Sequence, residues 1–141
     1  MSYTNKVKIQ FLNKSANEGF ARVAVAAFVT QTDVTVEQLA DIKTAVSEAV
    51  TNAIVHGYES MVGYITLECE LDGDTVVITV SDFGRGMSDI ELARQPLYTS
   101  RPELERSGMG FTVMETFMDT VEVTSSLGIG TTVKMTKKLQ G

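Results

Sequence analysis

Alternation of apolar and polar residues predicts five strands in this chain. Close to the N-terminus, Val7, Ile9 and Phe11 alternate with polar neighbours, which is the period of a half-buried strand. The same period recurs on both sides of Asp72-Gly73, a dipeptide typical of a hairpin turn. The strands predicted on this basis are residues 7–11, 64–71, 75–81, 121–125 and 131–138.

The strand period also assigns two polar or reactive side chains to the core side. Cys69 lies in phase with Ile65 and Leu67, so we expect a small core residue there and not a nucleophile. Asp82 continues the phase of Val80 at the end of its strand. Its carboxylate should therefore point toward the layer that covers the sheet.

A first helix is predicted to start at a capping box formed by Ser15 and Glu18. The segment FARVAVAAFV that follows is too continuously apolar for an ordinary surface helix, so we expect two buried faces, one in the core and one on a partner. Arg22 is the only charge between Phe20 and Gln31. A partner contact and an arginine that snorkels at the helix edge both fit this position.

A second capping box, Thr35 with Gln38, predicts a longer helix that ends at Gly57, where glycine can adopt the left-handed conformation. Glu48 and Asn52 are four residues apart, on a face different from the apolar one. The predicted core face consists of Leu39, Ile42, Val46, Ala49 and Ala53.

The stretch 88–107 has a different character, since it holds both prolines of the chain together with several charged residues. We expect it to be a mobile lid or an insertion. Gly108-Met109-Gly110 then leads into the helix FTVMETFM, and glycines at a helix start aim backbone amides at phosphate oxygens. This order of elements predicts an α/β two-layer sandwich, with helices on one face of a mixed, mostly antiparallel sheet.

Composition narrows the class of protein. At 141 residues and 43% hydrophobic content, residues 1–141 are expected to form a single domain. The net charge of −6 argues against direct binding of nucleic acid and fits a basic protein partner. A single cysteine and the absence of a long apolar run predict a cytoplasmic protein with no membrane segment.

The stretch SDFGRGM, residues 81–87, begins like the magnesium-binding turn of protein kinases. Such a kinase also needs an HRD catalytic loop, which this sequence does not contain. The DFG match is therefore weak, and the D-x-G-x-G pattern of Asp82, Gly84 and Gly86 is by itself usually a turn. It joins Glu48-x-x-x-Asn52 and the glycine pair at 108–110, three weak motifs whose order and spacing together are specific.

With these three motifs in this order, the chain resembles the GHKL (Bergerat) nucleotide-binding fold of gyrase, Hsp90, histidine kinases and MutL. EAVTNAIVHGY looks like its N box, DFGRGM its first glycine box and RSGMGF its second. Within that fold, ARQPLYTSRPELERSGMGF and the NEGFAR helix are most similar to sporulation anti-sigma factors that are also serine kinases. The likeness spans nearly the whole chain.

The resemblance implies ATP and Mg²⁺ as ligands and assigns roles to site residues. Asp82 would bond the adenine amino group, Asn52 would ligate magnesium and Glu48 would be the general base. The remaining positions implied for nucleotide binding are Gly84, Gly86, Arg101, Ser107, Gly108, Met109, Gly110 and Thr131. Relatives often carry lysine where this chain has Arg101.

The resemblance also implies partners. It suggests a homodimer that sequesters a sporulation-type sigma factor and phosphorylates a serine of an anti-anti-sigma protein. An ATP-gated sigma-binding module of the general-stress type, without transfer chemistry, is one alternative. A histidine-kinase-like ATP-binding module is another, although the only histidine, His56, lies in the nucleotide-site helix and not on a separate dimerisation helix.

Overall fold

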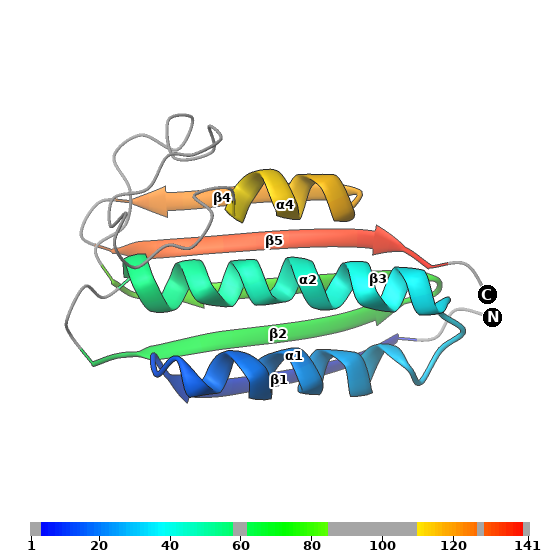
Figure 1. Ribbon diagram of the computed structural model, residues 1–141, viewed down its shortest axis with the longest axis horizontal. Helices are drawn as coiled ribbons and strands as arrows, with labels where there is room; N and C mark the ends of the chain where they lie inside the picture. Colours follow the sequence, from blue (N-terminus) through cyan, green and yellow to red (C-terminus); the bar gives the residue numbers. More distant parts are fainter. Residues whose placement is uncertain (1–3, 58–61, 85–109, 127–128, 140–141) are drawn as a thin grey trace.

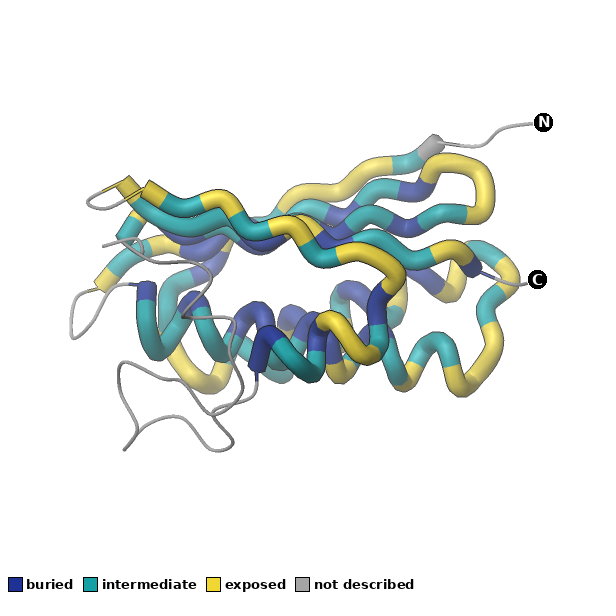
Figure 2. The backbone as a smooth tube through the Cα atoms, turned by 90° about the horizontal axis from the view of Figure 1, so that it is seen from above, coloured by how far each residue is buried: buried dark blue, intermediate teal, exposed yellow. Residues whose placement is uncertain are grey.

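The computed structural model describes residues 4–57, 62–84, 110–126 and 129–139. In these residues helices cover one face of a sheet, and the other face of the sheet is not covered by a helix (Figures 1 and 2). The helical elements are α1 (Ala16–Val29), α2 (Val36–Asn52), η1 (Ala53–Gly57) and α4 (Gly110–Phe117). The strands are β1 (Thr4–Leu12), β2 (Tyr64–Asp72), β3 (Thr75–Asp82), β4 (Thr120–Ser126) and β5 (Gly130–Lys138).

The sheet has the strand order β1-β2-β3-β5-β4, and each of its described pairings is antiparallel. The sequence prediction of a mixed sheet is therefore wrong in this detail. Between β1 and β2 the chain runs through two helices, so it enters the sheet again in the opposite direction. The register places Asp82 of β3 opposite Ile65 on one side and Thr131 on the other.

The core lies between the helices and the sheet, where the tube of Figure 2 is darkest. As predicted, Ile65, Leu67, Cys69 and Leu71 of β2 all face it and are buried. Burial away from water raises the pKa of the Cys69 thiol to about 12, so the thiolate is suppressed and the residue packs as a small apolar group. The core face predicted for α2 is also confirmed, with Leu39 partly buried at its edge.

The two predicted capping boxes have different outcomes. Thr35 is extended and its side chain accepts a hydrogen bond from the backbone of Gln38, whose own side chain caps residue 35 in return. Ser15 instead has helical angles and makes no side-chain cap, so the first box is wrong. Ser15 already has helical backbone angles in the turn after β1. The backbone carbonyl of Ser15 accepts a hydrogen bond from the backbone N–H of Glu18 at 3.2 Å.

The C-terminal end of α2 also differs from the prediction. The α-helix stops at Asn52 and continues as the wider π-helical turn η1, in which Gly57 does not have a positive φ. Glycine is needed there for a different reason, which is its close contact with β3 described below. π-helical turns inside helices are frequent at functional sites.

Helix α1 has one buried face within this chain, made by Ala21, Val25, Phe28 and Val29. Phe20 and Val23 on its other side are 58% and 63% exposed, so the second face predicted to be buried is open in the single chain. The β2–β3 turn lies one residue later than predicted, because Asp72 pairs with Thr75 and Gly73 has a φ of +62°. Among the described residues, no helix is long and apolar enough to span a membrane.

Candidate nucleotide site

Asp82 is one of two polar residues buried in the described core, with 6% of its surface exposed. It lies at the end of β3 on the face covered by helices, as the strand period predicted. Its Oδ1 accepts a hydrogen bond from the backbone N–H of Gly84 at 3.0 Å. Burial raises the pKa of this carboxyl group, and hydrogen bonds from the backbone of Gly84 and Thr131 oppose the rise.

Two glycines beside Asp82 lie in contacts that are too close for a side chain. A Cβ on Gly57, at the end of η1, would lie 2.8 Å from Cγ of Asp82. A Cβ on Gly84 would lie 1.6 Å from the backbone oxygen of Gly57. The end of the long helix and the end of β3 therefore meet backbone to backbone beside the carboxylate.

The start of β5 forms the next wall of the site. Gly130 has a φ of +138°, and a Cβ there would lie 2.2 Å from the backbone oxygen of Asp82, so only glycine fits. The hydroxyl groups of Thr131 and Ser125 lie 2.8 Å apart, and Ser125 donates to the carbonyl of Gly130 at 3.1 Å. Ser125 was not predicted from the sequence, although its pairing with Thr131 in the last hairpin is the signal that could have found it.

Glu48 and Asn52 meet the first residue of α4. A Cβ on Gly110 would lie 3.0 Å from Nδ2 of Asn52 and 3.4 Å from Oε2 of Glu48. The predicted N-box side chains and the last glycine of the second glycine motif are thus in contact, although 57 or more positions separate them in the sequence. Because the N-terminus of a helix carries a partial positive charge, this corner suits an anionic group.

Several predicted site residues lie outside the described residues. They are Gly86, Arg101, Ser107, Gly108, Met109 and the whole of the predicted lid, residues 88–107.

Arg22 lies on α1 and not among the residues around Asp82 or Gly110. Its Nε lies 3.7 Å from Oε2 of Glu18. No cluster of three or more His, Cys, Asp or Glu residues suited to a metal ion occurs within the described part of the chain.

The fold agrees with comparisons to known proteins. Residues 12–137 match the histidine kinase-like ATPase domain family, so the chain belongs to that class. The RsbU and RsbW domains of a Mycobacterium tuberculosis protein superpose with a TM-score of 0.71 at 23% identity, covering 96% of this chain and 32% of that one. The histidine kinase domain of a blue-light activated histidine kinase from Erythrobacter litoralis superposes with a TM-score of 0.62 at 23% identity, covering 89% of this chain and 60% of that one.

Curated relatives are similar over nearly their whole length. The anti-sigma F factor of Thermoanaerobacter pseudethanolicus is 59% identical over 137 residues, which cover 97% of this chain and 96% of the relative. That of Clostridium beijerinckii is 60% identical over 135 residues, covering 95% and 94%. The chain therefore belongs to the anti-sigma F factor family.

Proposed function

We propose that this protein is an anti-sigma factor that uses Mg-ATP to phosphorylate a serine of its anti-anti-sigma antagonist. The observation that carries the proposal is that one continuous helical element, α2 with η1, touches both ends of the candidate site. Its residues Glu48 and Asn52 contact Gly110, and five residues after Asn52 its last glycine contacts Asp82. Membership of an ATPase family makes ATP the nucleotide that such a site takes.

In this proposal Asp82 accepts a hydrogen bond from the adenine amino group. A buried carboxylate with two backbone donors already in place is a fixed acceptor, and an amino group is the donor that it needs. Thr131 lies opposite Asp82 on the same face of the sheet, so its hydroxyl is our second candidate for the base. Gly84 and Gly130 allow the backbone segments around Asp82 to pack closely at that end of the site.

The phosphate end is assigned to the start of α4. The backbone N–H groups at Gly110, with Gly108, Met109 and Ser107 before it, would bind phosphate oxygens, and Arg101 and Gly86 remain candidates for further contacts. Asn52 fits a magnesium ion, because its amide oxygen is a hard ligand and Mg²⁺ keeps several waters and shares phosphate oxygens. That ion would neutralise charge on the phosphates.

Glu48 is proposed as the general base. A serine hydroxyl of the partner would lose its proton to Glu48 while its oxygen bonds to the γ-phosphorus. The bond from that phosphorus to the bridging oxygen would break, and ADP would leave. The carboxylate lies beside Gly110, where the phosphates are expected, and this position supports the role.

The proposal extends to partners and location. The relatives are named as anti-sigma F factors, which supports a sporulation-type sigma factor as the sequestered partner in the cytoplasm. We place Arg22 in a partner contact and propose a homodimer. The open face of α1, with Phe20 and Val23 exposed, supports a surface that another chain covers.

The test is mass spectrometry of a purified, unphosphorylated anti-anti-sigma protein after incubation with Mg-ATP and either wild type or Glu48→Gln. We expect phosphate on a partner serine with wild type only, while both proteins bind ATP. Transfer by Glu48→Gln at the wild-type rate would remove Glu48 from the mechanism. ATP binding without any transfer by wild type would instead favour an ATP-gated sigma-binding module.

A further inference from the structure

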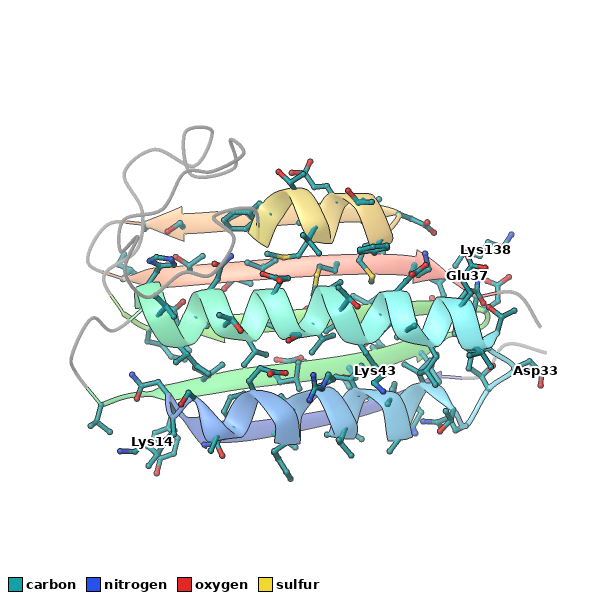
Figure 3. The ribbon with its side chains drawn as sticks, viewed as in Figure 1. Lys14, Asp33, Glu37, Lys43 and Lys138 are labelled. Carbon is teal, nitrogen blue, oxygen red and sulfur yellow. The ribbon has the colours of Figure 1, made fainter. Side chains whose placement is uncertain are left out.

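Ser125 of β4 belongs to a polar row that crosses the sheet at the proposed adenine end of the site. The register pairs Ser125 with Thr131 of β5, and Thr131 with Asp82 of β3. Directly paired residues have their side chains on the same face of a sheet, so these three share the face that the helices cover. Lys138, labelled in Figure 3, marks the opposite end of β5. Because Ser125 lies two strands away from Asp82, it can act on a bound base only through Thr131.

Two short contacts fix the direction of the hydrogen bonds around Ser125. Its hydroxyl oxygen lies 3.1 Å from the carbonyl oxygen of Gly130 and 2.8 Å from the hydroxyl oxygen of Thr131. A carbonyl oxygen can only accept, and a serine hydroxyl has one proton to donate. Both contacts are hydrogen bonds only if Ser125 donates to Gly130 and Thr131 donates to Ser125. The proton of the Thr131 hydroxyl therefore points toward β4 and away from Asp82.

This arrangement makes Asp82 and the Thr131 hydroxyl a pair of acceptors. The proton of the Thr131 hydroxyl is used by Ser125, so its oxygen offers only lone pairs to a ligand. The backbone groups of Gly84 and Thr131 donate to the Asp82 carboxylate, and an ionised carboxylate is itself an acceptor. The 6-amino group of adenine has two N–H donors for such a pair, directly or through a bridging water, whereas a 6-oxo group has none.

We propose that Ser125 is a positioning residue for nucleotide selection, because it holds the Thr131 proton away from the base and so favours a 6-amino purine over a 6-oxo purine. This inference rests on the proposed function, in which the same site binds ATP, and it adds a residue that does not touch the base. Without the Ser125 hydroxyl, the Thr131 hydroxyl can rotate and donate its proton to a 6-oxo oxygen. Loss of Ser125 should therefore weaken the discrimination between the two kinds of purine.

The test compares Ser125→Ala with Ser126→Ala, which makes the same chemical change one residue later, at an exposed position on the other face of β4. Displacement of a fluorescent ATP analogue measures Kd for ATP and for ITP, whose bases differ only in the 6-substituent and the proton on N1. We expect wild type to bind ATP at least about tenfold more tightly than ITP. Ser125→Ala should lower this ratio by about threefold to tenfold, the effect of one hydrogen bond, and Ser126→Ala should keep it.

Two further variants separate base selection from folding. Ser125→Thr keeps a hydroxyl on a residue that suits a strand, so it should restore the wild-type ratio of the two Kd values. Thr131→Val removes the hydroxyl that Ser125 controls, so adding Ser125→Ala in this background should not change the ratio further. If Ser125→Ala weakens ATP and ITP equally, its role is purely structural and the inference is overturned.

The measurements also distinguish this inference from the proposed function. ATP binding by wild type, with the same ratio in Ser125→Ala, would reject the role of Ser125 and leave the nucleotide site standing. No ATP binding by wild type would reject the proposed function and the role of Ser125 together. A lower ratio in Ser125→Ala, with no phosphoryl transfer by wild type, would support Ser125 and reject the kinase assignment.

Discussion

Gly57 and Asp82 are in such close contact that a single methyl group on the glycine would come within 2.8 Å of the aspartate Cγ. The contact joins the end of the η1 turn to the end of β3. The position of the buried carboxylate therefore depends on the absence of a side chain at residue 57. This dependence can be measured.

We expect Gly57→Ala to lower the free energy of unfolding by about 1–3 kcal/mol, the usual cost of overpacking a tight contact. Because the methyl group would displace Asp82, ATP affinity should fall by about tenfold or more, as measured by calorimetry. Gly19→Ala is the matched control, since its Cβ would meet only an Arg22 nitrogen, at 3.8 Å. An alanine at 57 with unchanged ATP affinity would show that Asp82 does not need this contact.

Asp82→Asn should change how stability depends on pH. The pKa of Asp82 is raised by burial, so its charged form costs stability that is absent below the unfolded value of 3.8 and grows as pH rises toward the folded value. As the pH rises above 3.8, the free energy of unfolding of wild type should therefore fall relative to that of Asp82→Asn. Urea denaturation across this range measures it, with exposed Asp33→Asn as the control. A difference in unfolding free energy between the two proteins that does not change with pH would contradict this prediction. The same variant should also bind ATP more weakly.

Gly110→Ala should separate phosphoryl transfer from adenine binding. The methyl group would lie 3.0 Å from Nδ2 of Asn52, so the amide must move by a few tenths of an ångström. Small displacements of positioning groups can cost about a hundredfold in rate, so we expect turnover to fall by about tenfold to a hundredfold. Single-turnover transfer and ATP titration measure the two effects. Thr116→Ala, exposed on the same helix, should leave both unchanged.

The two predicted helix caps should differ in their contribution to stability. Thr35→Ala removes a capping box and should cost about 1 kcal/mol in the free energy of unfolding. Ser15→Ala removes no side-chain cap and should stay within about 0.5 kcal/mol of wild type. Thermal and urea denaturation of the two variants test this difference. Equal losses would mean that the serine hydroxyl has a role the structure does not contain.

These caps illustrate how far the sequence predicts the fold. The strand period correctly places Asp82 on the core face, and the Thr35 box forms because Thr35 itself has extended backbone angles. The Ser15 motif is equally good as a pattern, but the direction in which the chain leaves β1 decides its backbone angles. Local patterns therefore predict elements and faces, while tertiary geometry decides which local hydrogen bonds form.

The site shows the same limit. The motifs around Glu48, Asn52 and Asp82 are readable in the sequence, but the reason for Gly57 is a distant strand, and a helix-ending glycine looks the same in sequence. Arg22 was singled out as an isolated charge on an apolar helix. Lys43 of α2 lines the same pocket as Arg22, but no local pattern indicates this, because the packing of α1 against α2 brings the two residues together.

The sheet register also shows where the protein can be attached to a surface or a reporter. Thr4, Asp72, Thr75 and Lys138 lie in one row across β1, β2, β3 and β5, at the end of the sheet opposite Asp82. Asp82 lies seven residue steps along β3 from Thr75 in that row, which is roughly 23 Å at the usual rise of a strand. A biotin or fluorophore joined before β1 or after β5 would leave the nucleotide end open, so immobilised protein can be titrated with nucleotide and partner proteins in turn.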